Sequence, residues 1–230
     1  MGITNKQIEN VSVGIALLVH VSGALGILFT PYKDWFVAFT PLNLLLMLFL
    51  LIANQRQRNR PFWIFAGICF AAGMVTEMIG VHTGWLFGHY QYGTIMGPKL
   101  AGVPLMIGVY WFVIVFCSGT FMRLLIERLF RPFSILPGFF DRRSTRLVII
   151  FDGAIIATCF DLIMEPTAIK LGFWQWDGLI VPVYNYVCWF VISLALLILF
   201  QYIAIDKKNH FAVHLLIIQL LFFLALSFYL

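Results

Sequence analysis

Charged residues are scarce in this chain of 230 residues. They make up 11% of the sequence, whereas hydrophobic residues make up 62%, and soluble proteins carry about 25% charged residues. The composition therefore excludes a water-soluble domain. Long apolar runs fill the sequence, each near the ~20 residues that cross a bilayer as a helix. These runs span residues 9–29, 36–53, 62–81, 103–125, 146–165, 182–204 and 211–230. The sequence predicts an all-α polytopic membrane protein with about seven transmembrane helices.

Sequence patterns for metal and cofactor sites are also missing. The four cysteines stand alone in different apolar runs, without a Cys-x-x-Cys pair, so neither a zinc site nor a disulfide framework is expected. The chain has no Gly-x-Gly-x-x-Gly, phosphate loop, His-Glu-x-x-His or Gly-x-Ser-x-Gly motif. Their absence argues against nucleotide-binding enzymes, zinc proteases and serine hydrolases. The histidines lack di-iron oxygenase spacing, and the last apolar run has no lysine for a retinal Schiff base. We expect no metal and no cofactor.

The positive charges are unevenly distributed between the two sides of the predicted membrane domain. If the N-terminus lies inside, 12 of the 15 lysines and arginines face the cytoplasm, and only Lys33, Lys99 and Lys170 face outward. An excess of Lys and Arg marks cytoplasmic loops. We therefore expect a cytoplasmic-membrane protein with a cytoplasmic N-terminus and an outer C-terminus. Its basic residues would meet anionic lipid head groups, and no nucleic-acid partner is expected.

One stretch of the chain occurs twice. Residues 77–92 align without a gap with residues 161–176, and a gap of six residues extends the alignment into the following apolar run. The aligned pairs include Glu77 with Asp161, Gly88 with Gly172, Tyr90 with Trp174, Gln91 with Gln175, Tyr92 with Trp176, Pro104 with Pro182 and Trp111 with Trp189. The alignment predicts a parallel internal repeat, with units of about 62–125 and 146–204, inside a single transmembrane domain, 1–230.

Three acidic residues are expected to meet near the outer leaflet. The runs that carry Glu77, Asp161 and Glu165 both travel outward, and Asp161 and Glu165 lie about 40° apart on one helix face. Burial and mutual repulsion disfavour three charged carboxylates, so at least one is expected to be protonated. A carboxylic acid in an apolar cavity can act as a general acid. The alternative is structural, namely hydrogen bonds between helices or a pair with Lys99 or His82.

Aromatic residues accompany these acids. Aromatic faces stabilise positive charge, so acids beside aromatic rings suit a reaction through a carbocation. A belt of aromatics at the membrane interface is the simpler alternative. The intramembrane His20 is a further candidate, although it can equally serve as a hydrogen-bond donor between helices. The substrate-binding candidates are His20, Trp85, Tyr90, Tyr92, Lys99, Trp174, Trp176, Tyr184, Asn185 and Trp189.

At these residues the sequence resembles the carotenoid biosynthesis membrane-protein family, which includes carotenoid 1,2-hydratases and bisanhydrobacterioruberin hydratase. The resemblance covers roughly residues 60–200. The sequence is also distantly similar to heterodimeric lycopene cyclases. Its first block reads Glu77-x-x-Gly80-Val81-x-Thr83-Gly84-x-x-Phe87-Gly88-x-Tyr90-x-Tyr92, followed by Gly97-Pro98-Lys99-Leu100-x-Gly102-Val103-Pro104. Its second block reads Asp161-x-x-x-Glu165-Pro166-x-Ala168 and Trp174-x-Trp176.

The resemblance implies a cofactor-independent hydro-lyase that adds water across the terminal C1=C2 double bond of an acyclic carotenoid. On chemical grounds, Asp161 would protonate C2, Glu77 or Glu165 would hold the attacking water, and His82 would support them. The alternatives are a lycopene-type cyclase and a small-molecule transporter built from parallel repeats. The expected partners are the carotenoid, membrane lipids and other enzymes of the carotenoid pathway.

Overall fold

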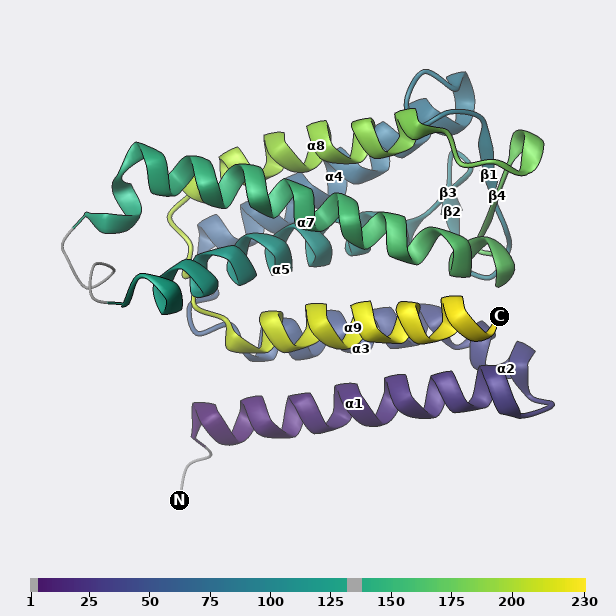
Figure 1. The fold of residues 1–230 in the computed structure, drawn as a ribbon, viewed down its shortest axis with the longest axis horizontal. Coiled ribbons are helices and arrows are strands. Elements are labelled where there is room, and N and C mark those ends of the chain that lie inside the picture. The colour runs from purple at the N-terminus through teal and green to yellow at the C-terminus, as the bar shows by residue number, and fades with distance from the viewer. Residues whose placement is uncertain (1–3, 132–137) are drawn as a thin grey trace.

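The computed structural model describes residues 4–131 and 138–230 as a bundle of helices, capped at one end by short strands (Figure 1). The helices are α1 (Asn5–Phe29), α2 (Lys33–Ala38), α3 (Thr40–Ala53), α4 (Arg60–Thr83), α5 (Leu105–Leu129), α7 (Arg143–Lys170), α8 (Val183–Tyr202) and α9 (His210–Tyr229), with 3-10 turns at Phe139–Asp141 (η1) and Asp177–Leu179 (η2). The strands are β1 (Tyr90–Tyr92), β2 (Lys99–Leu100), β3 (Val103–Pro104) and β4 (Trp174–Trp176). The prediction of an all-α polytopic membrane protein is confirmed.

Six of these helices are long and apolar enough to cross a membrane, namely α1, α4, α5, α7, α8 and α9. The predicted second span, 36–53, is instead divided. Its first residues belong to α2, and the chain turns at Phe39 before α3 begins with Pro41 in its first turn. Pro41 has no backbone N–H, and in a continuous helix its ring would clash with the carbonyl of Val37, which accounts for a break at this point. The 14 residues of α3 span only about 21 Å.

The helices alternate in direction through the bundle. Figure 1 shows α1, α4, α7 and α9 running toward the end that carries the strands, and α3, α5 and α8 running back. The N-terminus and the C-terminus consequently lie at opposite ends of the bundle. Because α4 and α7 run the same way, their C-terminal turns arrive together beneath the strands.

Side-chain caps account for the beginnings of three helices. Thr4 and Gln7 form a capping box at the start of α1. Asn59 accepts a hydrogen bond from the Phe62 N–H at the start of α4, and Asn209 accepts one from the Ala212 N–H at the start of α9. Such side chains satisfy backbone N–H groups that a helix leaves unpaired in its first turn.

Helix α5 is the central helix of the bundle. Its residues from Tyr110 to Thr120 are all buried, and it packs against α3, α4, α7, α8 and α9. The close approach of α4 depends on Gly73, because a Cβ atom there would lie 2.5 Å from the ring of Trp111. Small residues commonly allow membrane helices to approach in this way. Trp111 is thereby fixed between the two helices.

Helix α7 is longer than the sequence predicts. The predicted run 146–165 ends just before Pro166, and proline removes a backbone donor, but α7 continues through Pro166 to Lys170. The chain then turns at Leu171 and at Gly172, whose φ is +73°, and enters β4 directly. The longer helix holds Glu165 on the same face as Asp161.

The strands join the two aromatic loops across the end of the bundle. β1 and β4 pair antiparallel, with Tyr90 opposite Trp176, Gln91 opposite Gln175 and Tyr92 opposite Trp174. The two glutamines are exposed and the four aromatic side chains are buried, as the alternation of a strand requires. β2 and β3 form a second small hairpin before α5.

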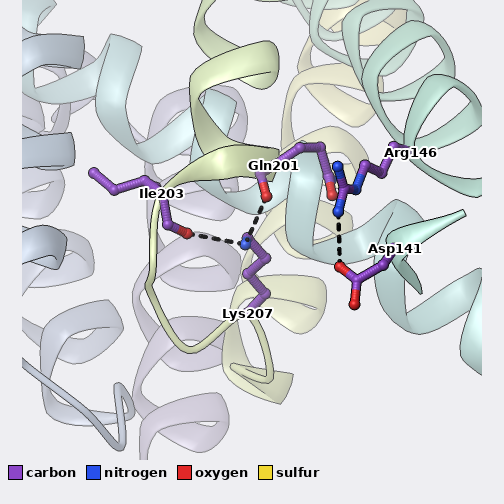
Figure 2. A network of polar contacts seen from close by, with 5 residues as sticks. All are labelled: Asp141, Arg146, Gln201, Ile203 and Lys207. Atoms are coloured by element: carbon purple, nitrogen blue, oxygen red, sulfur yellow. Dashed lines mark hydrogen bonds and ion pairs between the residues drawn. The ribbon is translucent and has the colours of Figure 1, made fainter. Parts of the chain in front are cut away.

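A separate polar network lies at the opposite end of the bundle (Figure 2). The Lys207 ammonium donates to the backbone oxygens of Gln201 (3.2 Å) and Ile203 (3.1 Å), and so satisfies carbonyls at the end of α8. Arg146 pairs with Asp141 at 2.9 Å and ties η1 to α7. Burial, and then the nearby Arg123 charge, lower the pKa of Lys207 to about 8.

Candidate active site

Three buried carboxyl groups meet beneath the paired strands. Glu77 lies near the end of α4, and Asp161 and Glu165 lie one turn apart near the end of α7. Their exposed fractions are 4%, 1% and 2%. All three line one cavity, and Asp161 interacts electrostatically with both of the others. Buried acidic groups in a membrane protein are rare and usually functional.

Glu77 is surrounded by hydrogen-bond donors. The hydroxyls of Tyr90 and Tyr92 both donate to its Oε2, the latter at 2.7 Å, and the Trp111 indole N–H donates to its Oε1 at 3.0 Å. Burial, followed by the charge of Glu77, raises the pKa of both tyrosines far above the usual range. The two phenols therefore stay protonated and remain donors at any physiological pH.

Glu165 is held by the second aromatic strand. The indole N–H groups of Trp174 and Trp176 both donate to its Oε1, the former at 2.7 Å. An indole N–H can only donate, so this oxygen of Glu165 must act as an acceptor. Glu165 consequently has the same kind of environment as Glu77.

Asp161 has a different environment from the two glutamates. Its Oδ2 accepts a hydrogen bond of 2.8 Å from the side-chain amide of Asn185, in the first turn of α8. It receives none of the indole or phenol bonds that hold Glu77 and Glu165. Among the three acids, Asp161 is therefore the one with the fewest donors around it.

The cavity between these groups is small and walled by aromatic rings. Its volume of about 30 Å³ gives room for about two water molecules, since one water needs about 10–15 Å³ on this measure. Trp111 and Trp189 stack in it, with ring centroids 4.0 Å apart and planes 13° apart. The lining residues are Glu77, Phe87, Tyr90, Tyr92, Ile107, Tyr110, Trp111, Asp161, Met164, Glu165, Trp174, Trp176, Asn185 and Trp189.

Five of the candidate residues lie outside this lining. His82 is exposed, and a ring N–H directed at the Ala101 carbonyl oxygen, 3.1 Å away, holds it on the loop. Trp85 and Tyr184 are 78% and 50% exposed. Lys99 donates to the backbone oxygen of Tyr92 at 2.6 Å and so supports the loop. His20 lies on α1, where its ring meets Phe222 edge-on and its Nδ1 lies 2.8 Å from the Ala16 oxygen.

Five side chains of the lining were not among the sequence candidates, namely Phe87, Ile107, Tyr110, Trp111 and Met164. Trp111 could have been found, because it aligns with the candidate Trp189. Tyr110 lies in a continuous apolar run and carries no distinguishing pattern. Phe87 has a positive φ of 66°, a conformation that is rare for a residue with a side chain, and its ring packs between Tyr90 and Trp111.

A metal site is not evident in the described part of the chain, where no group of three or more His, Cys, Asp or Glu side chains is arranged to hold an ion. The four cysteines are free, and Cys188 receives a hydrogen bond of 3.4 Å from the Phe87 N–H. The chemistry offered by the cavity is thus that of carboxyl groups, hydroxyls, amides and aromatic faces.

Comparison with known proteins connects this chain to carotenoid biosynthesis. A protein from Haloarcula japonica named bisanhydrobacterioruberin hydratase is 28% identical over 196 residues, which cover 82% of this chain and 60% of that relative. The chain therefore spans about 60% of the length of the curated relative it matches. No solved structure matches this chain. A family profile described as "Carotenoid biosynthesis protein" matches residues 36–230, a range that contains all three buried acids, and the chain belongs to that family.

Proposed function

We propose that the protein is a carotenoid hydratase that adds water across the terminal C1=C2 double bond of an acyclic carotenoid end group. Membership of the family supports a carotenoid substrate, and the relative from Haloarcula japonica is named as a hydratase. The observation that carries the proposal is the cavity itself, in which three buried carboxyl groups and room for water lie between aromatic rings. Protonation of an alkene and capture of the cation by water need these components.

The reaction can be written with the atoms of the site alone. The Asp161 carboxylic acid gives its proton to C2, and the electron pair of the double bond forms the new C–H bond and leaves a tertiary cation at C1. A water oxygen then bonds to C1, and a glutamate takes the proton that this water loses. The product carries a tertiary alcohol, and one water is consumed without any oxidation or reduction.

The hydrogen bonds support this division of roles. Trp111, Trp174 and Trp176 donate N–H groups to Glu77 and Glu165, and hydrogen bonds of this kind favour the ionised carboxylate. Glutamates whose oxygens accept several hydrogen bonds suit stabilisation of the cation and acceptance of the proton. Asp161, with the Asn185 amide as its bonded donor, is the better candidate for the general acid.

We also propose that residues 62–125 and 146–204 are two copies of one unit. Gln91 and Gln175, which align, pair at the centre of the β1–β4 ribbon. Trp111 and Trp189, which also align, stack on each other. In both contacts a residue meets its own counterpart, as expected for two units that are related by an approximate two-fold axis.

The proposed copies differ in their acids. Glu77 aligns with Asp161, but the position that aligns with Glu165 is Val81. In the second unit the extra acid, Glu165, receives the indole donors of the strand. Because Glu165 takes these hydrogen bonds, Asp161 receives none from the strand of its own unit, whereas Glu77 does. This difference supports a proton-donating role for Asp161.

Substrate binding requires the cavity to enlarge. A space for about two water molecules cannot hold an isoprenoid end group of five carbon atoms. Several of the aromatic side chains in the lining must therefore move when the polyene enters, and the cation then forms in contact with their faces. A cation beside a desolvated aromatic face gains about 2 kcal/mol.

The proposal is tested by expressing the protein in cells that make lycopene and analysing the pigments. A more polar, hydroxylated pigment is expected, with loss of its formation in Asp161→Asn. Asp152→Asn is the matched control, because Asp152 is a carboxyl of the same helix that lines a different surface groove, with Phe151 and Leu194.

A ring-bearing pigment of unchanged polarity would instead indicate a cyclase, and an unchanged pigment would leave transport as the function. Full activity of Asp161→Asn would exclude Asp161 as the acid.

A further inference from the structure

The hydroxyl of Tyr110 is a polar group in the cavity that the scheme above does not use. Tyr110 lies in the second turn of α5 and is 7% exposed. Its hydroxyl has no hydrogen-bond partner among the described residues, although it lines the same cavity as the three acids. Phe160 of α7 packs edge-on against its ring, with centroids 6.0 Å apart, and helps to fix its orientation.

A buried hydroxyl without a partner is unfavourable by about 1–3 kcal/mol. Phenylalanine would fill nearly the same space without this penalty, so the hydroxyl calls for a partner that comes from outside the protein. The cavity has room for about two water molecules, and a buried water needs two to four polar contacts. Tyr110 and the carboxyl groups supply them together.

The hydroxyl also lies on the side of the cavity where the proton would be delivered. Tyr110 interacts electrostatically with Asp161, the proposed acid. The residue that aligns with Tyr110 in the second unit is Cys188. Its sulfur accepts a hydrogen bond from the Phe87 N–H. The equivalent position of the second unit therefore carries no hydroxyl.

We infer that the Tyr110 hydroxyl holds the water that captures the carbocation, and so decides that the enzyme hydrates its substrate. This inference rests on the proposed hydratase function. The water donates one hydrogen to the Tyr110 oxygen and the other to a glutamate carboxylate, which leaves a lone pair for C1. When the C–O bond forms, the glutamate takes the second hydrogen as a proton. Without this water, the cation loses a proton to give an isomerised alkene or closes to a ring.

The partition of products tests the role of Tyr110. In Tyr110→Phe we expect total conversion of lycopene to stay within about threefold of the wild type. The ratio of hydroxylated to isomerised and cyclised products should fall about tenfold, because one hydrogen bond of about 1.4 kcal/mol is lost. Tyr229→Phe, at an exposed tyrosine outside the cavity, should leave the ratio unchanged. A purely structural role would lower all products together, and an unchanged ratio in Tyr110→Phe would overturn the inference.

Radiolytic hydroxyl-radical labelling tests the water site without reference to activity. Water next to a buried ring yields radicals on irradiation, so we expect Tyr110 to be oxidised in the intact protein and neighbouring Phe160 to stay unmodified. Phe160 is fully buried and is not part of the cavity lining. Absence of labelling at Tyr110 would overturn the inference even if hydroxylated pigment forms. Labelled Tyr110 in a protein that makes no hydroxylated pigment would contradict the proposed function and retain the water site.

Discussion

The donors around Glu77 come from two separate parts of the chain. Tyr90 and Tyr92 reach it from the strand that follows its own helix, whereas Trp111 reaches it from α5. The Trp111 ring also stacks on Trp189 and packs over Gly73. One side chain therefore positions a carboxylate and forms part of the aromatic wall at the same time.

The indole N–H of Trp111 can be removed while most of the ring contact is kept. We expect Trp111→Phe to lower the conversion of lycopene by about 10- to 100-fold, since a hydrogen bond to a charged group contributes about 1.5–3 kcal/mol. Trp189→Phe is the comparison, because it shortens the same stack without removing a donor from Glu77, and its loss should be several-fold smaller. Equal losses in the two variants, measured as pigment formed per unit of purified protein, would show that stacking rather than the hydrogen bond matters.

The sequence could predict the acids of this site but only part of their surroundings. Glu77, Asp161 and Glu165 stand out because charges are rare in the apolar runs, and Tyr90, Tyr92, Trp174 and Trp176 stand out because they repeat. Tyr110 lies among the uninterrupted apolar residues of α5, where nothing local separates a cavity wall from ordinary packing, and Trp111 can be recognised there only through its alignment with Trp189. The pairing of Glu165, and not Asp161, with the second strand follows from the extension of α7 through Pro166, which no local pattern indicates.

The β1–β4 ribbon positions the aromatic donors over the cavity. The residue after β1, Gly93, lies against the residue before β4, and its N–H donates to the Phe173 oxygen at 2.8 Å. A Cβ atom on Gly93 would lie 2.1 Å from the Gly172 carbonyl oxygen, and a backbone atom of that kind cannot move aside alone. The ribbon therefore depends on glycine at this position.

Opening the ribbon should disturb the site as well as the fold. We expect Gly93→Ala to lower the thermal unfolding temperature in detergent by about 2–10 °C, since overpacking costs about 1–3 kcal/mol. It should also reduce pigment conversion about tenfold or more, because Trp174 and Trp176 move away from Glu165. Gly67→Ala, at a helical glycine with open space around its Cβ position, should change neither property. Wild-type behaviour of Gly93→Ala in both measurements would contradict the proposed role of the ribbon.

The hydrophobicity of the sequence predicted where the helices lie better than it predicted where they begin and end. The runs were located correctly because each is long and apolar, but the break between α2 and α3 depends on local sterics at Pro41 rather than on hydrophobicity. The strands were missed as strands for a different reason. Three residues of β1 and three of β4 form a ribbon only because the tertiary fold brings two distant loops together.

The whole molecule separates most of its basic residues from its cavity. The acids, strands and stacked tryptophans lie at one end of the bundle. The Lys207 and Arg146 network lies at the other (Figures 1 and 2), together with most of the lysines and arginines. Since basic residues concentrate on the cytoplasmic side of membrane proteins, we propose that the cavity lies in the outer half of the membrane and that the N-terminus is cytoplasmic.

This orientation can be tested with single cysteines at the two ends of the bundle. Asp34→Cys lies in α2 at the cavity end, and Arg58→Cys lies in the turn between α3 and α4 at the other end. Both positions are exposed. Cys159 is replaced by serine because it is exposed, whereas Cys69, Cys117 and Cys188 are buried and can stay. A membrane-impermeant maleimide added to intact cells should label position 34 and reach position 58 only after the cells are permeabilised. Labelling of position 58 alone in intact cells would place the N-terminus outside and the cavity on the cytoplasmic side, because the N-terminus and position 58 lie at the same end of the bundle.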